Sequence, residues 1–129
     1  MKNPFAEWTG NFALLAVAVF AVGAFFGVQL TLFNNFIVKQ LAIEPFDLGM
    51  VEALREVPGF LNALFIALVV RLAPSLVAGA ALGVMGLGIM AYAKVHSVPS
   101  LAVYSIIWSI GFHCWLPLEQ SLCLLFSPP

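Results

Sequence analysis

Apolar residues fill this chain in four long stretches that carry no charged side chain. These charge-free runs cover 8–38, 57–70, 72–93 and 97–118. Three of them exceed the roughly 18 residues that indicate a transmembrane helix, and the second is shorter. None alternates apolar with polar residues as a membrane β-strand does, so each run predicts a helix.

Short polar segments that contain prolines separate the runs, at 39–47, 71–74 and 94–99. Extending the second run upstream, across Glu52, Arg55 and Glu56, gives it the length of a full crossing. The expected fold is therefore all-α, a single polytopic membrane region over 1–129. Its four transmembrane helices are expected at about 11–38, 48–71, 75–94 and 99–125.

Composition supports a chain surrounded by a lipid bilayer. Hydrophobic residues make up 63% of the chain and charged residues 9%, whereas soluble domains carry roughly 25% charged residues. The net charge is −1, so there is no basic surface for nucleic acid. Charge leaves the orientation open: with the N-terminus inside, Lys2 and Arg71 face the cytoplasm while Lys39 and Lys94 face out.

Motifs for catalysis or metal binding are missing from the sequence. It contains no His-Glu-x-x-His zinc motif, no Gly-x-Ser-x-Gly nucleophile motif and no phosphate-binding loop. Cys114 and Cys123 lie on one predicted helix, and with His113 they do not supply the four ligands of a structural zinc site. We therefore expect no enzyme activity, no metal and no cofactor.

Small residues occur in the first and third predicted helices at the spacing that lets membrane helices approach closely. Gly23 and Gly27 form one such pair, and Gly79 and Gly83 form another. Packing within the bundle is the expected role, with a dimer interface as the alternative.

Charged residues in the second predicted helix are expensive to place in a membrane, at roughly 2.5–3.5 kcal/mol each. Glu52 and Arg55 are three residues apart and can pair locally. Glu56 is then left for another helix or for protons, and Asn62 shares the face of Arg55. This group is either a solvated helix end with a local ion pair or the polar lining of a substrate path.

The fourth predicted helix carries a polar stripe made of Ser105, Ser109, His113 and Gln120. His113 is either a hydrogen-bonded packing residue or a titrating group in a water-filled cavity, since the ordinary pKa of imidazole is about 6.5. Glu119 lies roughly 120° around the helix from His113 and is expected to face a neighbouring helix.

The first predicted helix adds polar residues in its second half. They are Gln29, Thr31, Asn34 and Asn35, and the amides among them can contact a solute or brace neighbouring helices.

Helix order and spacing, together with two segments, resemble the beginning of a major facilitator superfamily transporter. The segments are LREVPGF at 54–60 and GFHCWLPLEQSL at 111–122. The resemblance implies a cytoplasmic N-terminus, a multi-pass protein of the cell membrane, and a solute cavity lined by the first, fourth and part of the second helix. By position it makes Asn34, Asn35, Arg55, His113 and Glu119 candidate path residues.

The chain departs from this family in the connection between its second and third helices. In the family this connection usually reads glycine, then an acidic residue, then basic residues. Here only the basic Arg71 matches, and Val70 stands where the acidic residue belongs. We expect the first four helices of a longer transporter, inactive alone, whose partners are the remaining helices and an unidentified small solute. The alternative is a complete four-helix protein, either a dimeric small exporter or an accessory subunit. Small exporters usually place a carboxylate in their first helix, and 8–38 contains none.

Overall fold

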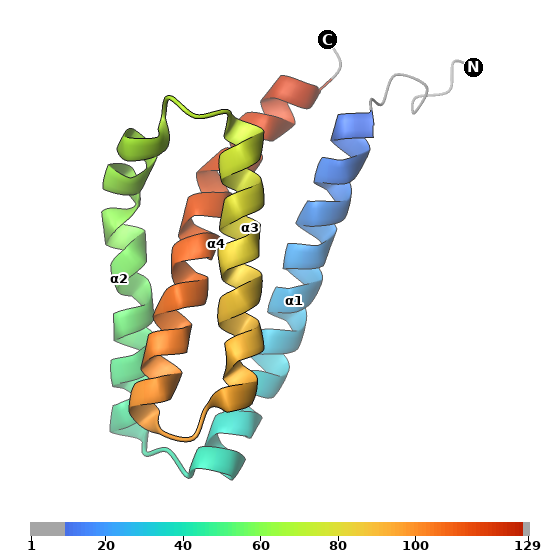
Figure 1. Ribbon diagram of the computed structural model, residues 1–129. Coiled ribbons are helices and arrows are strands. Elements are labelled where there is room, and N and C mark those ends of the chain that lie inside the picture. The colour runs from blue at the N-terminus through green and yellow to red at the C-terminus, as the bar shows by residue number, and fades with distance from the viewer. Residues whose placement is uncertain (1–9, 128–129) are drawn as a thin grey trace, which may run out of the picture.

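The computed structural model describes residues 10–127, apart from the side chain of Asn34, so that candidate lies outside the described part of the chain. The described residues form four long helices and one short 3₁₀ turn, and no strand (Figure 1). This confirms the predicted all-α fold. In chain order the elements are α1 (Gly10–Leu41), α2 (Pro45–Val69), α3 (Pro74–Met90), η1 (Ala91–Lys94) and α4 (Val98–Phe126).

Local sequence explains where the helices begin. α2, α3 and α4 each have a proline in the first turn, where its missing N–H breaks no helical hydrogen bond. Ser97 caps α4, because its side chain accepts a hydrogen bond from the backbone N–H of Ser100, whose hydroxyl in turn accepts from the backbone N–H of Ser97. The third predicted helix is shorter than expected: it ends at Met90 and tightens into η1.

Three segments of the described chain are long and apolar enough to cross a membrane: Gly10–Phe33, Pro74–Lys94 and Val98–Phe126. The structure thus has three of the four crossings expected. α2 does not reach the same apolarity, since Asp47, Glu52, Arg55 and Glu56 all lie in its first half.

α4 is the central element of the bundle (Figure 1). It packs closely against α3 and α2, and α1 lies along it more loosely. One buried cluster joins α1, α3 and α4 around Met85, Trp108 and Trp115. A second cluster, which includes Ile37, Val51 and Leu101, closes the end of the bundle that carries the α1–α2 and η1–α4 connections.

The glycines that allow close packing are not the ones that their spacing indicated. A Cβ on Gly88 would lie 2.5 Å from the backbone nitrogen of Trp108, and one on Gly111 would lie 2.6 Å from that of Met85. These two glycines let the backbones of α3 and α4 touch. In contrast, a Cβ on any glycine of the two predicted pairs would meet nothing within 4 Å. The prediction that these pairs pack helices together within the bundle was therefore wrong; they are Gly23, Gly27, Gly79 and Gly83.

Candidate functional site

Arg55 lies between two carboxylates on the face of α2 that turns toward α4. Its Nη2 is 2.5 Å from Oε2 of Glu52 and 3.2 Å from Oε1 of Glu56. Its Nε and Nη2 both donate to the same oxygen of Glu56, Oε1. The local pair of Glu52 and Arg55 therefore forms as their spacing predicted, and Glu56 joins it.

His113 approaches this ion cluster from α4. Its Nε2 lies 3.6 Å from Oε2 of Glu56, which is longer than a normal hydrogen bond. The approach depends on Gly59 of α2, because a Cβ there would lie 2.8 Å from Cε1 of the imidazole ring. A glycine at this turn of α2 thus makes room for His113 beside Glu56.

A chain of hydrogen bonds ties the cluster to the neighbouring elements. Trp108 Nε1–H donates to the hydroxyl of Tyr92, 2.5 Å away, and that hydroxyl lies 2.8 Å from Oγ of Ser105. The guanidinium carbon of Arg55 is 5.6 Å from the centroid of the Trp108 ring, a cation–π arrangement. Ser109 adds a direct link between helices, since its hydroxyl donates to the carbonyl oxygen of Arg55.

α1 contributes one buried polar residue, Gln29. The buried residues of α1 lie along one face of the helix. Three of them are aliphatic and the fourth is Gln29; the aliphatic ones are Leu15, Val22 and Ile37. Nε2 of Gln29 is buried and has no hydrogen-bond partner among the described residues. An unsatisfied buried amide is costly, which makes this position a candidate contact for water or a ligand.

Two cavities meet at Gln29 and Arg55. The first, of about 80 Å³, lies between α1, α2 and α4. The second, of about 270 Å³, extends it along α2 beside Glu52 and Leu48. The lining of the first is Phe26, Gln29, Leu30, Arg55, Glu56, Trp108, Ser109, Phe112 and His113.

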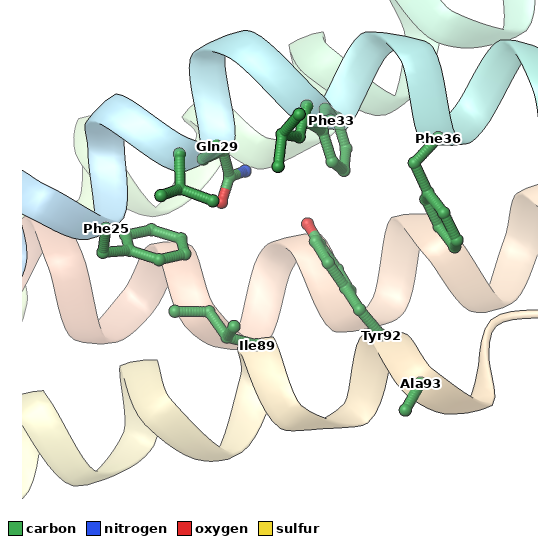
Figure 2. A pocket seen from close by; sticks show the side chains of 9 residues that line it. Phe25, Gln29, Phe33, Phe36, Ile89, Tyr92 and Ala93 are labelled. Carbon is green, nitrogen blue, oxygen red and sulfur yellow. The ribbon is translucent and has the colours of Figure 1, made fainter.

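A third, mainly apolar pocket of about 360 Å³ lies between α1 and the end of α3. Figure 2 shows the amide of Gln29 reaching into this space from α1, and the hydroxyl of Tyr92 pointing back toward α1. The ring of Phe33 stacks on Tyr92 with 5.5 Å between centroids. Gln29 therefore borders both the polar cavities and this apolar pocket.

The structure brings together three of the predicted site residues, Arg55, Glu56 and His113. The other predicted site residues whose side chains the structure describes do not line the two polar cavities. Asn35 is exposed and its Nδ2 donates to the carbonyl oxygen of Thr31, while Arg71 is exposed after α2 and Gln120 is exposed on α4. Oδ1 of Asn62 is buried without a partner among the described residues, and Glu119 is half-buried.

Sequence reasoning did not single out Tyr92 or Gly59, and it left Gln29 outside the predicted site. Tyr92 stands near Lys94 at the end of an apolar run, a position typical of a membrane-interface anchor rather than of a buried network. The seven-residue spacing of Leu15, Val22 and Gln29 is the one signal that could have marked Gln29 as a buried polar residue.

Metal binding finds no support in the part of the chain that the structure describes. No group of three His, Cys, Asp or Glu side chains there could hold a metal ion, and Cys114 and Cys123 are free thiols. Comparison with protein-family models, curated proteins and solved structures yields no match for this chain.

Proposed function

We propose that this chain is part of a membrane transporter for a small solute, with Arg55, Glu56 and His113 on the solute or proton path. The observation that carries the proposal is the depth of the ion cluster in an apolar bundle. At 1.5 Å per residue, Arg55 lies about 15 Å from the start of α2, and His113 lies about 22 Å from the start of α4. Both depths fall near the middle of a hydrocarbon core of about 30 Å, where ionisable residues are usually functional.

α2 is the fourth crossing in this proposal. It runs beside α4 along the bundle (Figure 1), and its 25 residues span about 37 Å. Glu52, Arg55 and Glu56 pair with one another, and Glu56 approaches His113 of α4, which lowers the cost of placing these three side chains at membrane depth. Four crossings bring Gly10 and Ser127 to the same side, and we propose the cytoplasmic side of the cell membrane.

The transporter that we propose is of the major facilitator type, in which two halves rock about a central site. The support for it is the resemblance of 54–60 and 111–122, together with the polar faces of α2 and α4 that meet at Glu56 and His113. In this proposal further helices complete the solute path, so the 129-residue chain in liposomes takes up no solute.

Topology is tested by cysteine labelling at Glu44→Cys and Ser97→Cys, two positions at one end of the bundle. A membrane-impermeant reagent should label both from outside the cell. Labelling of both from the cytoplasmic side alone would reverse the orientation.

Function is tested by uptake into cells that express the intact gene, screened over sugars, amino acids, amines and organic acids and normalised to folded protein. Arg55→Ala should abolish uptake, and His113→Ala should change its dependence on pH between about 5.5 and about 8. If both variants transport like the parent, these residues are structural and the proposed path is wrong. Saturable uptake by the 129-residue chain alone would favour the dimeric small exporter.

A further inference from the structure

The ion cluster carries one more negative than positive charge while His113 is neutral. Glu52 and Glu56 contribute two carboxylates and Arg55 one guanidinium. No other Asp, Glu, Lys or Arg lines either polar cavity. Arg55 is shared by two carboxylates, so the charge of the half-exposed Glu56 is only partly compensated, and this place in the bundle attracts a cation.

The carboxylate oxygen of the cluster that receives no hydrogen bond from Arg55 is Oε2 of Glu56. Arg55 donates its two hydrogen bonds to the other oxygen, Oε1. Oε2 faces His113 at 3.6 Å, and no hydrogen bond joins them at that distance. This oxygen is therefore free to accept a hydrogen bond from a cation in the cavity of about 80 Å³.

The walls of that cavity favour an organic cation over a metal ion. Phe26, Trp108 and Phe112 stand next to one another, with ring centroids 4.6 to 6.2 Å apart. Aromatic faces attract ammonium and guanidinium groups, and Arg55 already uses the face of Trp108 in this way. Metal cations such as Ca²⁺ instead require six or more oxygen ligands, whereas the side chains of this lining offer oxygens only from Glu56, Gln29 and Ser109.

Gln29 is the second, independent sign of a ligand. Its side chain is nine-tenths buried, borders both polar cavities, and has an amide nitrogen without a partner among the described residues. Half a turn about its last side-chain bond exchanges the NH₂ group for the carbonyl oxygen. The carbonyl oxygen can then accept a hydrogen bond from the same ammonium group that binds Glu56.

We propose that a small primary ammonium compound binds between Glu56, Gln29 and the aromatic wall of Phe26, Trp108 and Phe112. The inference rests on the proposed function, since it names the class of solute that the path would carry. The 80 Å³ cavity has room for several water molecules or one small cation, and the 270 Å³ cavity beside it accommodates a larger substituent.

Protons compete with such a ligand at this site. The titratable and charged groups that face it are Glu52, Arg55 and Glu56 from α2 and His113 from α4, while α1 contributes the neutral amide of Gln29. Protonation of Glu56 or His113 cancels the excess negative charge. Ammonium binding should therefore weaken as the pH falls.

The test is equilibrium binding of radiolabelled methylammonium to the chain in lipid nanodiscs at neutral pH. Glu56→Gln keeps the shape of the side chain but removes its charge, and should weaken binding at least about tenfold. Glu44→Gln removes a carboxylate just before α2, far from the cavities, and should bind like the parent. Circular dichroism should show the same helical content in all three proteins.

Gln29→Leu sharpens the test, because it fills a buried position with an apolar side chain and should raise stability while lowering methylammonium affinity. The inference would be overturned if Glu56→Gln and the parent bound methylammonium with equal affinity, or if the parent bound no methylammonium. It would also be overturned if the site bound sodium, in a way that depends on Glu56, but no methylammonium. If the intact gene transports a neutral or anionic solute, only the inference fails. If methylammonium binds but cells take up no solute, only the proposed function fails.

Discussion

The two sides of α4 are built in opposite ways. Toward α3, backbone meets backbone through Gly88 and Gly111, and the buried residues around them are apolar. Toward α2, the contacts are an ion cluster, a histidine and hydrogen bonds, and two cavities lie there beside Gln29 of α1. Close packing makes the first side rigid, whereas unpartnered polar atoms and empty space let the second side change its contacts.

The difference matters because water provides no hydrophobic driving force between helices in a bilayer. The α3–α4 pair holds together by close van der Waals contact, and it forms a fixed platform. Polar side chains of α4, such as Ser109 and His113, then contact α2 from that platform. The solute site that we propose lies on the loose side, so it could rearrange while the fixed side keeps its geometry.

The largest effect is expected where the backbones touch. Gly88→Ala and Gly111→Ala each force α3 and α4 apart, because the new methyl group would overlap backbone atoms that have no freedom to move. We expect each to lower the free energy of unfolding by about 2–3 kcal/mol, measured by thermal or SDS-induced unfolding in detergent. Gly79→Ala and Gly83→Ala are matched controls with open space around them, and a comparable loss in these would contradict the comparison.

A smaller loss is expected from Arg55→Ala on the loose side. It leaves Glu52 and Glu56 as unneutralised neighbours, but the side chain of Glu56 is 51% exposed, which limits the cost. We expect a loss of about 1–2 kcal/mol in the same unfolding assay. Arg55→Lys keeps the charge but loses the forked geometry, so it should fall between the parent and the alanine variant.

The hydrogen bond between Trp108 and Tyr92 is best measured by a double-mutant cycle. Trp108→Phe removes the indole donor, and Tyr92→Phe removes the hydroxyl that accepts from it. The coupling energy of the two substitutions should be about 1 kcal/mol. A coupling of zero would mean that this bond does not hold η1 to α4.

The smallest effect on stability is expected from Gly59→Ala. Its methyl group would meet the imidazole ring of His113, which can rotate away, rather than a backbone. Unfolding free energy should change by about 0.5 kcal/mol or less, while the pH dependence of uptake should shift because His113 leaves Glu56. A loss as large as that of Gly88→Ala would show that the α2–α4 side is also rigid.

Sequence alone predicted the helices well, since long apolar runs and the prolines at 45, 74 and 99 mark their extent and starts. It also predicted the pair of Glu52 and Arg55, because a spacing of three residues is local information. It did not predict which helix faces meet, and so the wrong glycines were chosen for close packing. Gly88 and Gly111 follow no recognisable spacing, and their role depends on where α3 crosses α4.

The site shows the same limit. The sequence left Glu56 for another helix, but in the structure Glu56 also pairs with the adjacent Arg55. Its approach to His113 depends on Gly59, a residue whose role appears only when α2 lies against α4. Tyr92 enters the network because η1 ends beside Trp108, sixteen residues away in sequence. Helix packing between distant segments, rather than local propensity, decides these contacts.

The central position of α4 has a consequence for how the protein is made. During synthesis α1, α2 and α3 leave the ribosome before α4. Yet His113, which approaches the carboxylate of Glu56, and Ser109, whose hydroxyl donates to the backbone carbonyl of Arg55, both belong to α4. A nascent chain that stops before residue 98 therefore offers the bilayer an α2 whose Glu56 has no partner outside its own helix. In the proposed topology, insertion of α2 should be completed only when α4 emerges, so a later helix stabilises an earlier one in the lipid phase.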